Sequence, residues 1–137
     1  MTLASHSEDT WVATVYYGTD EGTNFYVVTD PNSKHGKQIE QNPRVAFSIF
    51  DSRTKITQNK KGIQGQGICN LVKSPAEILK GLTLWHKANP GKEGRITIDM
   101  IKKALDTKLY KIEPTLLKFF NKELYGESEY GIWEKEK

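Results

Sequence analysis

Cationic and hydrogen-bonding side chains are concentrated in one short stretch, residues 29–43, with the sequence TDPNSKHGKQIEQNP. This pattern is typical of a strand end, a tight turn and a short helix. A helix N-terminus favours negative charge, yet Lys34, His35 and Lys37 all lie in the expected first turn. With the hydroxyl of Ser33 and the free backbone N–H groups of that turn, they form a group of donors suited to a phosphate dianion.

Two further features of the stretch bear on this interpretation. Asn32 or Ser33 can cap the helix, because either side chain accepts a hydrogen bond from a backbone N–H group. Glu40 lies three residues after Lys37 and can pair with it, so a solvated helix with incidental lysines is the alternative to an anion site. The charges alone leave both interpretations open.

Strands are expected over most of the first half of the chain. The residue patterns predict them at residues 2–7, 11–17, 24–29, 44–50 and 62–72. The turn residues GTDEGT at 18–23 predict a hairpin between the second and third of these strands. Gly62, Gly65 and Gly67 indicate a bend or a bulge in the long strand, of the kind that curves a barrel.

Helices are expected only later in the chain. The sequence SPAE at 74–77 is a capping box with proline at the first helical position, so a helix is predicted from there to NPG at 89–91. A second short helix is predicted at 99–105. A last strand is expected at 110–121, with Pro114 at an edge or a bend, and the polar tail after it is assigned no strand.

This order of elements predicts a mainly β fold with peripheral helices, a small antiparallel barrel in one domain over residues 1–137. The single cysteine, Cys69, excludes an intrachain disulfide and a cysteine-cluster metal site, and no metal is expected. A net charge of +3 is too small to argue for nucleic acid. No segment resembles a membrane span or a signal region, so the expected location is the cytoplasm.

The string VVTDPNSKHGKQIEQNPRVAF resembles the segment YT…SRKG.QL..NP.VA of pyridoxamine 5′-phosphate oxidases and the wider FMN-binding split-barrel superfamily. The residues in register with that pattern are Ser33, Lys34, Gly36, Gln38, Ile39, Asn42 and Pro43. The expected strand order also fits, over about half of the chain. The resemblance implies a six-stranded antiparallel split β-barrel that works as a homodimer, with FMN at the subunit interface. It also implies flavin-dependent oxidoreductase chemistry on an unidentified small-molecule substrate.

The resemblance gives Lys34 and His35 a specific role, because a basic pair after the serine holds the FMN phosphate in this superfamily. Lysine in place of the usual arginine keeps the charge but loses the bidentate geometry. Histidine in place of the usual lysine makes part of the phosphate binding depend on protonation, since a free histidine titrates near ~6.5.

Other positions match the superfamily in a looser register. Val28 and Thr29 correspond to the strand end that passes the ribityl chain and the ring of the flavin. A glutamine that contacts the ring has Gln58 as its nearest match, with Lys60 or Lys61 as alternatives.

The ends of the chain depart from the true oxidase, which has an N-terminal substrate segment and an RLAP-like ending that contains arginine. This chain ends GIWEKEK instead, so we expect no oxidation of vitamin B6 compounds. Trp133 in this tail is predicted to lie over the cofactor of a second subunit, and packing of the tail onto its own barrel is the alternative.

Two other classes of function are compatible with the sequence. A non-enzymatic OB- or SH3-like barrel would hold single-stranded nucleic acid, or another phosphorylated ligand, through Lys55, Lys60 and Lys61 with exposed aromatic residues between them. The net charge of +3 gives nucleic acid no support of its own. A split barrel that binds deazaflavin or haem in place of FMN is the other alternative.

Overall fold

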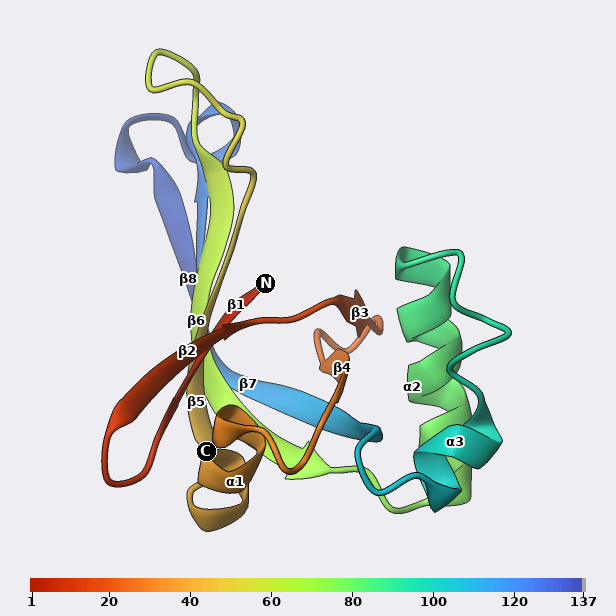
Figure 1. Cartoon of the computed structure of the whole chain (residues 1–137). Coiled ribbons are helices and arrows are strands. Elements are labelled where there is room, and N and C mark those ends of the chain that lie inside the picture. Colours follow the sequence, from red (N-terminus) through yellow and green to blue (C-terminus); the bar gives the residue numbers. More distant parts are fainter. Residues whose placement is uncertain (137) are drawn as a thin grey trace.

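A computed structural model describes residues 1–136 of the chain as one antiparallel sheet with helices beside it (Figure 1). The strands are β1 (Thr2–His6), β2 (Thr10–Thr14), β3 (Tyr17–Thr19), β4 (Phe25–Thr29), β5 (Arg44–Phe50), β6 (Lys61–Leu71), β7 (Lys108–Asn121) and β8 (Tyr130–Glu134). The helices are α1 (Lys34–Gln41), α2 (Pro75–Ala88), α3 (Ile98–Lys103), α4 (Lys122–Tyr125) and the 3₁₀ turn η1 (Gly126–Ser128). Over the described residues, no helix has the length and apolar character that a bilayer crossing needs.

The sheet curls so that its two edge strands are neighbours in the chain. The strand order is β2-β1-β5-β6-β7-β4-β3, and β8 lies off this path on β7. Only Val15 and Tyr16 separate β2 from β3, although these strands stand at opposite edges of the sheet. The expected mainly β, antiparallel architecture is therefore confirmed.

β7 pairs along one side with two strands in succession. Residues 108–112 pair with β4 and residues 116–120 pair with β8, while β6 follows the other side. The register of β6 against β7 shifts between Gln66 and Gly67, where a Cβ on the glycine would lie 2.5 Å from the carbonyl oxygen of Glu113. This bulge is the bend expected from the glycines. Beyond it the strands continue as an arm, formed by residues 61–66, 116–121 and 130–134 (Figure 1).

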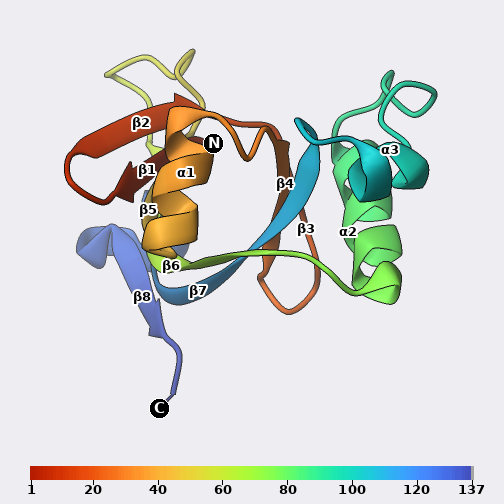
Figure 2. The same cartoon turned by 60° about the horizontal axis from the view of Figure 1, so that its bottom comes forward.

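Apolar side chains form two cores, one on each face of β4. Phe25 and Val27 belong to the barrel core, whereas Tyr26 and Val28 belong to the core under α2 and α3, because successive strand residues face opposite sides. The rest of the buried barrel core is Leu3, Val15, Ile39, Val45, Phe47, Cys69, Tyr110 and Ile112. Through Ile39, α1 is anchored to the barrel, while α2 and α3 lie on the other side of β3 and β4 (Figure 2).

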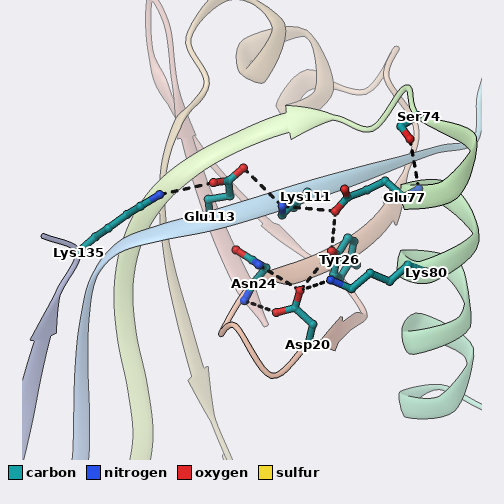
Figure 3. A network of polar contacts seen from close by, with 9 residues as sticks. All are labelled: Asp20, Asn24, Tyr26, Ser74, Glu77, Lys80, Lys111, Glu113 and Lys135. Carbon is teal, nitrogen blue, oxygen red and sulfur yellow. Dashed lines mark hydrogen bonds and ion pairs between the residues drawn. The ribbon is translucent and has the colours of Figure 1, made fainter. Parts of the chain in front are cut away.

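A polar network attaches α2 to the hairpin of β3 and β4 (Figure 3). The hydroxyl of the buried Tyr26 donates to Glu77 at 2.7 Å and lies 3.4 Å from Asp20. Asp20, whose side chain is 8% exposed, also accepts from Lys80 at 2.7 Å and from Asn24 at 3.1 Å. Burial opposes the ionisation of Asp20, but the hydrogen bonds from Lys80 and Asn24 outweigh it and lower the pKa to about 2.

Most predicted elements are present, one predicted strand has the wrong extent, and one strand was not predicted. The hairpin turn, α1, β5 and the start of α2 after Ser74 are as expected. The strand predicted over 11–17 is divided into β2 and β3, because the chain changes there from one edge of the sheet to the other. The tail is not strand-free, since β8 completes hydrogen bonds that the outer part of β7 would leave open.

Asp20→Asn is expected to lower the free energy of unfolding at pH 7 by about 2 kcal/mol, because a carboxyl with a lowered pKa stabilises the fold only while it is ionised. This stabilisation is complete above the unfolded pKa of 3.8 and is lost as the pH falls through about 2. Urea unfolding should therefore show the difference from the native protein shrinking by about half at pH 3. The control is Glu21→Gln in the same turn, and a difference independent of pH would contradict the prediction.

Candidate functional site

α1 begins directly after β4, through a tight turn. The Oγ of Ser33 accepts from the N–H of Gly36 at 3.1 Å and donates to the carbonyl oxygen of Asp30 at 2.6 Å, so Ser33 rather than Asn32 is the helix cap. A Cβ at Gly36 would lie 2.6 Å from the carbonyl oxygens of Asp30 and Pro31. Only glycine permits this approach of the helix to the turn before it.

His35 lies between two hydroxyl groups. Its Nε2 is 2.7 Å from Oγ1 of Thr29, at the end of β4, and its ring nitrogens are each 3.2 Å from Oγ of Ser33. Burial lowers the pKa of His35, and the negative charge of Asp30 opposes this only in part. The ring is therefore mainly neutral at pH 7, where it acts as a hydrogen-bonding group rather than a cation.

Lys34 pairs with an acid from the turn between β1 and β2. Its Nζ is 2.6 Å from Oδ2 of Asp9 and 4.8 Å from the centre of the Trp11 ring. The hydrogen bond from Lys34 lowers the pKa of Asp9, so this carboxyl is ionised at neutral pH. Both side chains are largely exposed, 45% for Lys34 and 61% for Asp9, so the pair is weak and a ligand has access to it. The alternative pairing of Lys37 with Glu40 is absent from the ion pairs of residues 1–136.

A buried glutamine holds the β1–β2 turn against α1. Nε2 of Gln38 donates to the carbonyl oxygen and to Oδ1 of Asp9, at 3.1 Å and 2.7 Å. Oε1 of Gln38 accepts from the Oγ of Ser5 at 2.7 Å, and both side chains are almost fully buried. Asn42, after the end of α1, donates to the carbonyl oxygen of His6 at 3.0 Å. These bonds join α1, β1 and the turn into one unit.

The first turn of α1 fits a phosphate group, but it offers fewer free hydrogen-bond donors than the sequence predicts. The N–H groups of Lys34 and His35 have no acceptor within the helix, because they lie in its first turn. The side chain of Lys37, three residues after Lys34, is exposed, and that of Lys34 becomes available if Asp9 releases it. The proton of the Ser33 hydroxyl, in contrast, is directed into the turn and is not available to an anion.

Val28 and Thr29 lie on opposite faces of β4. The side chain of Thr29 points to His35, whereas that of Val28 packs against the core under α2. Thr29 therefore meets the α1 turn through its side chain, and Val28 adjoins it only through the backbone.

Gln58 and Trp133 lie away from α1 within one chain. Gln58 is in the connection at 51–60, where its Oε1 accepts from the N–H of Lys55 at 2.9 Å. The seven residues of β5, a length of roughly 20 Å, lie between this connection and α1. Figure 1 shows the connection and α1 at opposite ends of β5. Trp133 is in the arm, opposite Leu117 of β7. A role for either residue at the α1 turn depends on a second copy of the chain and stays a prediction.

An open groove of about 750 Å³ lies beside the β1–β2 turn, on the outer face of β1, β5 and β6. Its lining includes the basic residues His6 and Arg44 but no residue of the first turn of α1. The groove and the α1 turn are therefore two separate places for a ligand on this chain.

Asp9 and Trp11 were not expected at this site, and Gln38 had no assigned role. Lys34 follows Asp9 by 25 residues, and no local pattern connects them. The only available signal was an acid in the turn SED at 7–9, and it becomes informative only once β1 and β2 are known to lie beside α1.

Gly36→Ala is expected to lower the free energy of unfolding by about 1–3 kcal/mol, because the added methyl group would overlap two carbonyl oxygens of the turn. Alanine favours a helix over glycine by about 1 kcal/mol, so helix propensity alone predicts the opposite sign. Gly94→Ala is the matched control, since a Cβ there meets nothing within 4 Å. Equal stability of the two variants in urea unfolding would contradict this account of the turn.

No protein-family model matches the chain, and no curated protein sequence matches it significantly. Solved structures do match. A haem-binding protein from Mycobacterium smegmatis shares 15% identity at a TM-score of 0.76, over 97% of this chain and 51% of the other. HutZ, the haem storage protein of Vibrio cholerae, shares 16% identity at a TM-score of 0.66, over 98% of this chain and 84% of HutZ. General Stress Protein 26 from Bacillus anthracis shares 15% identity at a TM-score of 0.63, over 98% of this chain and 87% of the other.

These structures are split barrels of the pyridoxamine 5′-phosphate oxidase-like type. The predicted split-barrel fold is therefore confirmed, with β8 and the divided β2–β3 segment added to the expected strands. Identities this low establish the fold alone. The chain spans about half the length of the protein from Mycobacterium smegmatis.

Proposed function

We propose that this chain is a flavoprotein that holds FMN by its phosphate at the first turn of α1 and takes part in the oxidation or reduction of a small molecule. The observation that carries the proposal is the turn itself. On a split barrel, Lys34 and His35 stand at a helix N-terminus directly after the end of β4, with Thr29 beside them. The location of the protein in the cytoplasm stays a prediction from the sequence.

The chain's own residues would bind and orient the cofactor. The phosphate would accept hydrogen bonds from the N–H groups of Lys34 and His35, and the ammonium groups of Lys34 and Lys37 would balance its charge. The end of β4 at Val28 and Thr29 would lie alongside the rest of the molecule. Bound FMN would supply a ring that accepts and gives up electrons, so the chemistry needs no acid or base from the turn.

Haem is the second candidate, because two of the similar structures are named for haem binding or haem storage. His35 is the histidine of the α1 turn, and burial lowers its pKa, which favours the neutral form that ligates metals. Its Nε2 is already engaged by Thr29 at 2.7 Å. FMN is preferred because a phosphate uses the backbone N–H groups and the lysines together, whereas an axial bond to iron uses only the histidine.

The double variant Lys34→Ala/His35→Ala is expected to weaken FMN binding at least about tenfold, because it removes the charge-assisted contact of Lys34 to the phosphate and the hydrogen-bonding ring of His35 beside it. The measurement is titration of the purified protein with FMN, followed by flavin fluorescence and absorbance. Lys102→Ala, on α3, also removes one positive charge and should leave the affinity unchanged.

Two comparisons make this test decisive. Riboflavin, which lacks the phosphate, should bind the native protein and the double variant equally. A parallel titration with haemin, followed by its Soret band, tests the second candidate. Binding of haemin by a protein that has no affinity for FMN would overturn the flavin proposal.

We also propose that a second copy of the chain closes the site. Ile63, Leu117 and Trp133 lie on one face of the arm, where the barrel core ends, and Trp133 is 44% exposed. This apolar face continues the core into solvent, which is typical of a surface that a partner covers. A partner's arm would bring its Trp133 towards the cofactor.

Trp133→Ser is expected to shift a micromolar dimer towards monomer and to weaken FMN binding by roughly tenfold, as loss of a central aromatic residue does at interfaces. Sedimentation velocity and the FMN titration measure the two effects. Ile132→Ser is the matched control, because Ile132 is 59% exposed on the opposite face of the same strand. A native protein that is monomeric at micromolar concentration would contradict the proposal.

A further inference from the structure

The carboxylate of Asp9 forms an ion pair with Lys34, a lysine that the proposed phosphate site requires. Its Oδ2 is 2.6 Å from Nζ of Lys34, and the Trp11 ring lies beside the same ammonium group at 4.8 Å. The cation at the first turn of α1 therefore has an anion of its own in this structure.

The carboxylate of Asp9 is fixed in that position by more than its charge. Gln38 donates to Oδ1 and to the backbone carbonyl of Asp9, at 2.7 Å and 3.1 Å. Gln38 is in turn held by Ser5, and both are almost fully buried in the unit of α1 and β1. These two hydrogen bonds use the carbonyl oxygen and Oδ1 of Asp9, whereas Lys34 contacts Oδ2, so they do not require the pair with Lys34.

We propose that Asp9 is the internal counter-ion of the α1 turn and selects ligands by their charge, an inference that rests on the proposed function. A ligand gains Lys34 only by replacing Asp9, and the replaced carboxylate stays nearby, held by Gln38. A neutral group gains nothing from this exchange, and a single negative charge only substitutes for the one already present. A phosphate dianion brings more charge than it displaces, so Asp9 restricts the site to strongly anionic ligands.

Asp9→Asn is the direct test, because it removes the charge and keeps the size of the side chain. The variant should bind FMN and inorganic pyrophosphate about fivefold to tenfold more tightly than the native protein, since the competing charge is lost. Riboflavin should bind both proteins equally. Fluorescence of Trp11, next to Lys34, reports the binding of pyrophosphate without any flavin. Glu8→Gln, which removes the adjacent charge in the same turn, should change each affinity less than about twofold.

The single amide oxygen of asparagine can accept a hydrogen bond either from Gln38 or from Lys34, so Asp9→Ser repeats the comparison with a shorter uncharged side chain. Pyrophosphate bound equally by the native protein and both variants, or bound by none of them, overturns the role of Asp9. If FMN binds the native protein in that case, the proposed function stands without a role for Asp9. If pyrophosphate binds the variants more tightly while FMN binds no form of the protein, the role of Asp9 stands and the proposed cofactor is wrong.

Discussion

The turn from β4 into α1 has no room for a side chain at Gly36, and the geometry of the candidate site depends on that close approach. The carbonyl oxygens of Asp30 and Pro31 lie against the glycine, while Ser33 closes the turn with two hydrogen bonds. The start of α1 is therefore fixed relative to the end of β4. His35 meets Thr29 for this reason, and the first N–H groups of the helix face outward from a rigid support.

A second constraint is the buried side chain of Gln38, which connects α1 to β1 and the β1–β2 turn. The amide of Gln38 satisfies its oxygen through Ser5 and its nitrogen through Asp9, and a buried amide left without these partners would destabilise the fold. The β1–β2 turn is thus held beside α1 by a group that cannot easily be removed. The position of Lys34 and that of the acid facing it are consequences of one packing arrangement, and the charge of Lys34 is balanced before any ligand arrives.

The sequence was sufficient for the parts of this site that are local. A cap at Asn32 or Ser33, the short helix after β4 and the cations in its first turn follow from residue types at adjacent positions, and the structure identifies Ser33 as the cap. The partner of Lys34 does not follow from local sequence, because Asp9 lies beside Lys34 only when β1 and α1 are packed together. The division of residues 11–17 was missed for a similar reason, since alternation of apolar residues continues through Val15 while the hydrogen-bonding partner changes. None of the five residues of β8 is buried, and its only signal is the unpaired side of β7.

The short link between β2 and β3 has a consequence for aggregation. An open sheet normally exposes two edges, each with unpaired N–H and C=O groups that can recruit strands from other molecules. In the described part of this chain, β2 and β3 form the two ends of the main strand order, and the link of two residues keeps these edges together at one end. The outer side of β8 has no such tether. Intermolecular strand addition in a crowded solution should therefore begin at β8, where the charges of Glu134, Lys135 and Glu136 oppose it.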